Sequence, residues 1–93
     1  MTTSHDLSLF ELGHVIATPA ASESLGTGRV IKLVSLHCSG VWGDLCIEDV
    51  NANWRAIENG NRILSHYKLD CGDFYVITEW DRSITTVLLV NEY

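Results

Sequence analysis

Several common features are missing from this sequence, and each absence excludes a class of protein. The chain of 93 residues has one proline, six lysines and arginines, and no long hydrophobic run. Its apolar stretches are interrupted within a few residues by polar or charged side chains, whereas a transmembrane helix needs about 20 consecutive apolar residues. The amino terminus also lacks the basic and apolar regions of a secretory signal. We therefore expect no membrane association and a cytoplasmic location.

The cysteines do not follow the pattern of a disulfide-stabilised or metal-binding protein. Cys38, Cys46 and Cys71 are odd in number and widely spaced, unlike the even, dense frameworks of small secreted domains. Together with His37 and His66 they supply ligand types for zinc, but their spacing matches no finger, knuckle or ribbon. A phosphate-binding loop ending in Lys and Ser or Thr is also missing. We expect reduced thiols that serve as small core residues, no cofactor, no metal and no enzymatic activity.

Positive charge is scarce. Six basic side chains stand against twelve acidic ones, for a formal net charge of −6. The basic residues are scattered singly, whereas a nucleic-acid-binding protein usually gathers them on one face. We therefore expect no direct binding to nucleic acid. A partner with a basic groove, including a groove that normally holds nucleic acid, matches the sign of the charge.

What the chain does contain is the pattern of one small domain with helices in its first half. A chain of this length supports a single hydrophobic core, so we expect one domain over residues 1–93. A strand over 10–17 should lead into a helix over 19–25, for which Thr18 is a favourable N-cap. A second helix is predicted over 29–38, because its apolar residues recur at intervals of three and four.

A further helix is predicted before the strands begin. Asp44 could cap it, and Gly60 could end it in a left-handed conformation. Glu48 and Asp49 fall in the first turn, where a carboxylate stabilises a helix by about 0.3–1 kcal/mol. These acidic residues therefore indicate helix stabilisation, an acidic contact patch or an acid–base pair. The predicted inward face of this helix consists of Ile47, Val50, Trp54 and Ile57.

The last third of the chain alternates apolar and polar residues with the period of strands. Runs over 63–69, 74–80 and 84–90 are separated by turn residues, which predicts an antiparallel meander. We therefore expect an α+β fold in which an antiparallel sheet of three or four strands packs on two or three helices. Both faces of the meander hold apolar residues, so the face left open by the helices would be covered by the amino-terminal segment or a second copy.

The second turn of the meander concentrates charged and aromatic side chains. Glu79, Asp81 and Arg82 either shape the turn, with Asp81 bonded to backbone amides and Arg82 paired with an acid, or present a binding surface. The large Trp80 beside them favours binding. Trp42, between two glycines, is predicted to lie in the core, with an exposed anchor as the alternative.

Most of the chain resembles a family of small, largely uncharacterised proteins encoded on plasmids and other mobile elements. The most specific matches are Trp42-Gly43-Asp44-Leu45, the stretch over 62–67, and the stretch over 77–89 with the ending Glu92-Tyr93. Some members are labelled as restriction-system related, but 93 residues without a glycine-rich cofactor loop could not house a methyltransferase. Trp80 stands where the family usually has a small residue, which suggests a partner-binding surface particular to this chain.

The resemblance and the negative charge together imply a non-enzymatic binding protein that inhibits a host defence system. The partner would be a CRISPR effector or a restriction enzyme with a basic groove, met by protein–protein contact or by nucleic-acid mimicry. Two alternatives stay open: a small metal-dependent hydrolase using His37 and His66, and a structural homodimer that pairs through edge strands as a plasmid accessory protein. The residues expected to contact the partner are Asp44, Glu48, Glu79, Trp80 and Asp81.

Overall fold

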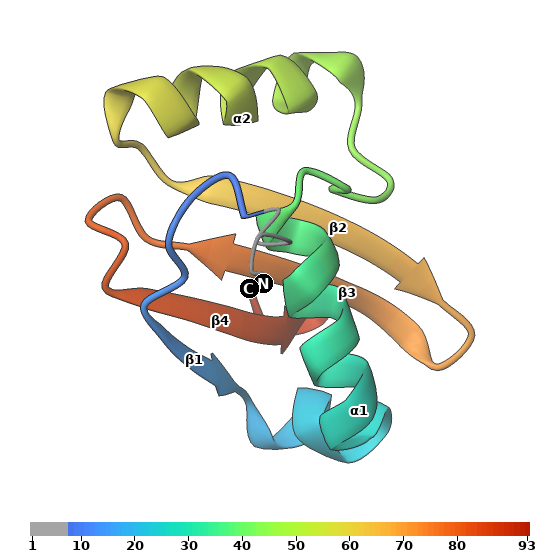
Figure 1. Cartoon of the computed structure of the whole chain (residues 1–93). Coiled ribbons are helices and arrows are strands. Elements are labelled where there is room, and N and C mark those ends of the chain that lie inside the picture. The colour runs from blue at the N-terminus through green and yellow to red at the C-terminus, as the bar shows by residue number, and fades with distance from the viewer. Residues whose placement is uncertain (1–7) are drawn as a thin grey trace, which may run out of the picture.

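The structure is a computed structural model that describes residues 8–93. Over these residues the chain forms two α-helices, four strands and a final turn of 3₁₀ helix (Figure 1). This α+β architecture confirms the predicted fold class. In chain order the elements are β1 (His14–Ala17), α1 (Pro19–Cys38), α2 (Ile47–Asn59), β2 (Ile63–Leu69), β3 (Gly72–Thr78), β4 (Ile84–Leu89) and the 3₁₀ helix η1 (Val90–Glu92).

The four strands form one sheet in the order β1-β4-β3-β2. β2, β3 and β4 are antiparallel neighbours, which confirms the predicted meander. β1 lies beside β4 and runs parallel to it, so the sheet is mixed and not wholly antiparallel as expected. The backbone N–H groups of His14 and Thr18 donate to the carbonyls of Ser83 and Val87 at 2.9 and 3.0 Å. A parallel pair needs a long crossover connection, and both helices lie between these two strands in the chain.

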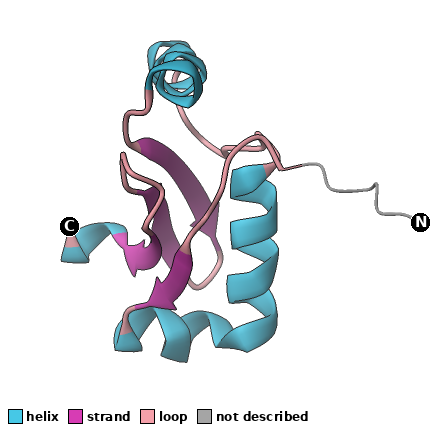
Figure 2. Ribbon diagram, turned by 60° about the vertical axis from the view of Figure 1, so that its left-hand side comes forward, coloured by secondary structure: helices cyan, strands magenta, loops and turns pink. Residues whose placement is uncertain are grey.

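α1 covers one face of the sheet, as Figure 2 shows. Thr18 is its N-cap, as predicted, and its hydroxyl accepts the N–H of Ala21 at 3.2 Å. The two predicted helices form one element with a kink at Gly26, whose φ of 75° and ψ of 163° are not helical. The predicted break is therefore confirmed at Gly26, and α1 consists of two helical segments that meet at this residue.

The interface between α1 and the sheet forms the main core. Alternate strand residues point toward the helix, and Phe74, Val76 and Val87 have no exposed surface. Full burial of such a side chain contributes about 1.5–3 kcal/mol, so this layer holds α1 on the sheet. The helix residues that complete the core are Ala21, Leu25, Leu33 and Val34.

α2 packs beside β2, at the edge of the sheet (Figure 2). Its buried residues are Asn53 and Ala56, whereas Ile47 and Trp54 are 65% and 49% exposed. The predicted inward face is therefore confirmed for Val50 and Ile57, which pack against the core, and wrong for Ile47 and Trp54. The predicted left-handed end at Gly60 is confirmed, with φ 73° and ψ 44°.

A second core cluster lies under α2 and contains two residues discussed from the sequence. Trp42 is 4% exposed, as predicted for a core residue, and its indole N–H donates to the carbonyl of His37 at 2.9 Å. Cys38 is buried in the same cluster, as expected. Cys46 and Cys71 are exposed, so the expectation of core thiols is wrong for these two.

The face of the sheet opposite α1 is partly covered by the carboxyl-terminal segment (Figure 2). The ring of Tyr93 meets the ring of Tyr75 edge-on, with centroids 5.5 Å apart, and the guanidinium of Arg62 lies 5.7 Å from the Tyr93 centroid. The expected cover by the amino-terminal segment is not seen in the described residues, because Leu9 donates instead to the carbonyl of Cys38 at the end of α1. Neither helix in the described part of the chain is long and apolar enough to cross a bilayer.

Candidate functional site

The segment before α2 pairs with the outer edge of β2. The N–H of Asp44 donates to the carbonyl of His66 at 2.7 Å, and the N–H of His66 donates to the carbonyl of Trp42 at 3.1 Å. The carboxylate of Asp44 accepts the N–H of Lys68 at 3.0 Å. Asp44 is therefore an exposed carboxylate that closes a sheet edge. The prediction that it caps α2 is wrong, since Cys46 occupies the N-cap position.

Asn53 completes this closure from α2. Its side-chain N–H donates to the carbonyl of Leu64 at 2.7 Å, and its side-chain oxygen accepts the N–H of Leu64 at 3.1 Å. The carboxamide thus supplies the two hydrogen bonds that a neighbouring strand would make. This pairing turns Asn53 inward, and Ile47 and Trp54 are left toward solvent. A count of apolar periodicity misses it because asparagine scores as a surface residue.

Arg82 anchors the tip of the β3–β4 hairpin to the carboxyl end of α2. Its guanidinium donates to the carbonyls of Ala56 and Asn61 at 2.9 and 2.7 Å, and to those of Glu79 and Trp80 at 3.0 and 3.2 Å. These four bonds replace the expected pairing with a neighbouring carboxylate. A cation near the last carbonyls of a helix is also favoured by the helix dipole. Arg82 therefore sets where the tip lies relative to α2.

The tip itself is a rigid turn that presents an acid and an indole. The carboxylate of Asp81 accepts the N–H and the hydroxyl of Ser83 at 3.1 and 2.6 Å, so its predicted bonding to the turn backbone is confirmed. The hydroxyl of Ser83, followed by its N–H, lowers the pKa of Asp81 below its ordinary value. Trp80 is 66% exposed beside it. The turn thus keeps an ionised carboxylate next to a large aromatic surface.

The five residues predicted for partner binding lie at the two ends of α2. Asp44 and Glu48 lie at its amino end, whereas Glu79, Trp80 and Asp81 lie in the hairpin tip held to its carboxyl end (Figure 1). A helix of this length spans about 18 Å. The predicted residues are therefore brought onto one layer of the molecule but do not converge on one point.

We call the surface formed by α2, the segment before it and the hairpin tip the acidic layer. The layer contains six carboxylates and two basic residues, Arg55 and Arg82, so its formal net charge is −4. The formal net charge of the whole chain is −6. Trp54 lies between its two ends, edge-on to the ring of Trp42 with centroids 5.0 Å apart. Half of the twelve acidic residues of the chain belong to this layer: Asp44, Glu48, Asp49, Glu58, Glu79 and Asp81.

A buried polar network around His37 was not foreseen from the sequence. Its Nδ1 and Nε2 lie 2.5 Å from Ser65 Oγ and 2.9 Å from Thr78 Oγ1. Thr78 and Thr85 bond through their hydroxyls at 2.7 Å, and Thr85 donates to the carbonyl of Leu12 at 2.7 Å. Because the Leu12 carbonyl can only accept, the Thr85 hydroxyl donates to it, and the Thr78 hydroxyl donates to Thr85. The Nε2 of His37 must then donate to Thr78, so the imidazole proton lies on Nε2. Burial lowers the pKa of His37 to about 3, and the ring is neutral.

His37 and His66 are not brought together. His37 contacts Ser65, and the next residue along β2 points to the opposite face of the sheet, as successive strand residues do. The Nε2 of His66 lies 3.7 Å from a carboxylate oxygen of Asp73. Within residues 8–93, no three His, Cys, Asp or Glu side chains gather as metal ligands. The placement of the two histidines gives no support to a hydrolase centre that uses both.

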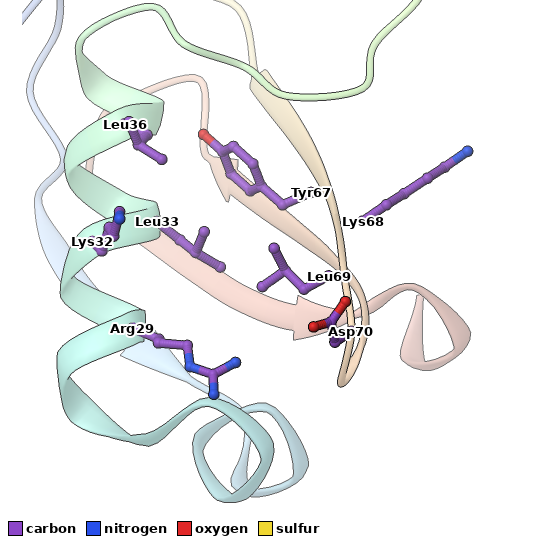
Figure 3. Close-up of a pocket in the computed structure, with 8 residues that line it drawn as sticks. All are labelled: Arg29, Lys32, Leu33, Leu36, Tyr67, Lys68, Leu69 and Asp70. Atoms are coloured by element: carbon purple, nitrogen blue, oxygen red, sulfur yellow. The ribbon is translucent and has the colours of Figure 1, made fainter.

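A groove of about 540 Å³ lies between α1 and β2 (Figure 3). Arg29 and Lys32 border it on the helix side and Asp70 borders it on the strand side, whereas the side chain of Lys68 extends away from it. Arg29 donates to the exposed sulfur of Cys71 at 3.5 Å. The groove combines charges of both signs, so it does not define the sign of a ligand. Its apolar lining comes from Leu33, Leu36, Tyr67 and Leu69.

Comparison with known proteins adds no relative to this description. No protein-family model, curated protein or solved structure matches the chain. The resemblance to mobile-element proteins therefore stays a prediction, and a function has to be argued from the geometry of the acidic layer.

Proposed function

We propose that the chain is a non-enzymatic binding protein whose acidic layer enters a basic groove of a partner protein. The observation that carries this proposal is the presence of half of the carboxylates and two exposed tryptophans, Trp54 and Trp80, on one layer. Surface charge speeds encounter and selects partners, whereas tryptophan is among the residues that most often supply binding energy. The carboxylates would steer the approach, and the two indoles would add short-range affinity.

The acidic layer is held in place before any partner binds. Arg82 fixes the hairpin tip through four hydrogen bonds, and Asn53 fixes α2 through two. A preorganised surface loses little conformational entropy on binding, so more of the contact energy remains as affinity. The spacing of about 18 Å between its ends suits an elongated groove better than a single pocket.

The partner class we propose is a nucleic-acid-handling enzyme of a host defence system, either a CRISPR effector or a restriction endonuclease. Such enzymes hold nucleic acid in channels lined by lysine and arginine. A row of carboxylates would compete for the same side chains, either by direct contact or by mimicry of phosphates. The negative charge of the acidic layer supports a partner with a basic groove. The sequence resemblance to mobile-element proteins supports a cytoplasmic defence enzyme as that partner.

DNA cleavage by a panel of purified restriction endonucleases and CRISPR effectors, with and without the chain, tests this function. The parent should inhibit at least one of them. The variant E48Q/E58Q/E79Q removes three charges from the acidic layer, and the matched control E11Q/E23Q/D70N removes three from elsewhere. Inhibition should weaken at least about tenfold for the first, since loss of a close charge pair costs more than 1.4 kcal/mol. Equal weakening in both variants would refute the acidic layer as the binding surface. No inhibition by the parent would refute the defence function.

The aromatic part of the surface can be tested without changing charge. Trp80 and Tyr93 are both 66% exposed, and Tyr93 lies outside the acidic layer. Trp80→Ala should weaken inhibition by a factor of about 30, the loss expected for a hot spot of about 2 kcal/mol, whereas Tyr93→Ala should leave it within about twofold. Unchanged inhibition by Trp80→Ala would remove this residue from the binding surface.

A further inference from the structure

The two edges of the sheet differ in how they are finished. The outer edge of β2 is closed by Trp42, Asp44 and Asn53. β1 forms the opposite edge, and in Figure 1 no further helix or strand of the described chain runs along its outer side. An open edge strand is a template for pairing with another chain. The sheet therefore has one edge at which it can be extended.

The backbone groups left open on β1 can be assigned from its pairing with β4. His14 and Thr18 donate their N–H groups toward β4. Because alternate residues of a strand bond to opposite sides, the N–H and C=O groups of Val15 and Ala17 point away from the sheet. No hydrogen bond within residues 8–93 occupies them. The open edge thus offers two donors and two acceptors in a regular row.

The side chains of β1 do nothing to discourage such pairing. Val15 and Ile16 are 41% and 40% exposed and lie on opposite faces of the sheet. Natural edge strands are usually protected by a lysine, a proline or a bulge. His14–Ala17 contains none of these, and it carries no acidic or permanently basic residue.

We propose that β1 pairs antiparallel with β1 of a second copy of this chain, around a two-fold axis at Ile16. In this register Val15 lies opposite Ala17 of the second copy, and Ala17 lies opposite its Val15. These two pairs exchange four hydrogen bonds through the open groups. Ile16 faces Ile16 of the second copy in the non-hydrogen-bonded position. Two sheets of four strands become one continuous sheet.

A second copy fits this edge because the contact is symmetric and free of repulsion. No facing pair in the register joins two acidic residues or two lysines or arginines, and His14 lies opposite Thr18. α2 and the segment before it lie at the other edge of the sheet, three strand spacings or about 14 Å away, so four of the six carboxylates of the acidic layer are far from the contact. The hairpin tip lies nearer, because the N–H of His14 donates to the carbonyl of Ser83. A two-fold contact also closes after two copies, and it uses the edge of the sheet opposite α2.

The pairing is expected to be weak and dependent on concentration. A four-residue strand pair buries much less than the roughly 1,600 Å² of a standard stable interface. Dimer formation should therefore appear as a rise in mean mass with protein concentration. This inference does not rest on the proposed function, because the pairing uses the open backbone groups of β1 and not the carboxylates of the acidic layer.

Cysteine cross-linking at the two-fold axis tests the register. Residues facing in a non-hydrogen-bonded antiparallel pair have Cα atoms about 4.5 Å apart, within the range of about 4.4–6.8 Å that a disulfide spans. In a C46S/C71S background, which removes the exposed native thiols, Ile16→Cys should oxidise to a covalent dimer. Val15→Cys is similarly exposed but faces Ala17, so it should cross-link at least about tenfold more slowly. Equal rates, or no cross-linking of Ile16→Cys, would overturn the proposal.

Light scattering over a concentration series gives an independent readout. The parent should rise above monomer mass, and Ile16→Lys, which places two cations at the axis, should stay a monomer. Val41→Lys, a matched change at an exposed apolar residue remote from β1, should dimerise like the parent. Far-ultraviolet circular dichroism confirms that each variant is folded. A parent that stays monomeric at every concentration, or a dimer unaffected by Ile16→Lys, would exclude β1 as the interface.

Discussion

The side-chain amide of Asn53 and the backbone of Leu64 form two hydrogen bonds of 2.7 and 3.1 Å, and this pair decides how α2 faces the sheet. A buried polar group without a partner costs about 1–3 kcal/mol. The carboxamide of Asn53 and the backbone of β2 satisfy each other's hydrogen-bonding groups. The helix therefore turns Asn53 inward and leaves Ile47 and Trp54 exposed to solvent. An exposed indole on the acidic layer is therefore the consequence of a polar contact.

Replacing Asn53 with aspartate should destabilise the chain by about 2 kcal/mol. The carboxylate keeps an acceptor for the N–H of Leu64 but presents a second negative oxygen to its carbonyl. Asn51→Asp makes the same chemical change at an exposed position of α2 and should stay within about 0.5 kcal/mol of the parent. Urea denaturation at neutral pH measures both free energies of unfolding. Similar values for the two variants would mean that Asn53 does not close the edge.

Adding one methyl group at Gly43 should be disruptive. Gly43 has a φ of 78°, and a Cβ there would lie 2.1 Å from the carbonyl oxygen of His66 and 2.8 Å from the ring of Tyr67. Gly43→Ala should lower stability by at least about 2 kcal/mol through strain and overpacking. Gly28→Ala, inside α1 with open space around the added atom, should instead raise stability by about 0.5–1 kcal/mol. Thermal unfolding of the pair shows whether the two signs are opposite.

Arg82→Lys should release the hairpin tip although it preserves the charge. A lysine ammonium cannot reach four carbonyls with the planar fork of a guanidinium, so the loss should be about 1–3 kcal/mol. Arg55→Lys on the exposed side of α2 serves as the control and should change stability by less than about 0.5 kcal/mol. Amide hydrogen exchange would localise the effect to residues 79–83. Unchanged protection there would contradict an anchoring role for Arg82.

The stability of the chain should fall in acid because His37 takes up a proton only when the chain unfolds. Burial lowers its pKa from the ordinary value of 6.5 to about 3. Between these values the unfolded chain binds one proton more than the folded chain. The contribution of His37 is therefore fully present above pH 6.5 and declines by about 1.4 kcal/mol per pH unit below it, until the folded-state pKa is reached. Urea denaturation at a series of pH values measures the slope.

Nuclear magnetic resonance separates this effect from the titration of carboxylates. The ring protons of His37 should show no midpoint between about pH 5 and 8, where a free histidine titrates, and the ring nitrogens should report a proton on Nε2. A midpoint close to the ordinary value would mean that the imidazole is reached by water and that the Ser65 and Thr78 bonds are not maintained.

Local patterns were sufficient to predict most elements of the fold. The meander over β2, β3 and β4 follows from strand-like alternation, and the Thr18 cap and the Gly60 terminus follow from backbone chemistry within a few residues. The parallel pairing of β1 with β4 could not be predicted in this way. It joins His14–Ala17 to Ile84–Leu89 across two helices, and nothing local to either segment specifies that contact.

The candidate site was predictable in composition but not in arrangement. Excess carboxylates and an aromatic residue at the hairpin tip are visible in the sequence, and Asp81 bonds its own turn as expected. The helix that carries Glu48 and the hairpin tip that carries Trp80 are held together by Arg82, which donates hydrogen bonds to the carbonyls of Ala56 and Asn61. The roles of Asp44 and Asn53 at the edge of β2 were likewise missed, since each depends on a strand distant in the chain.

The sequence by itself determined the fold class, the amino end of α1, the carboxyl end of α2, the meander and the surplus of negative charge, because these depend on neighbouring residues or on composition. Only the tertiary structure decided which face of α2 is buried, where the carboxylates gather and which edge of the sheet stays open. Those outcomes depend on hydrogen bonds between segments far apart in the chain, such as Asn53 with Leu64 and Asp44 with Lys68. Such bonds form only when folding removes their groups from water and leaves each a single partner.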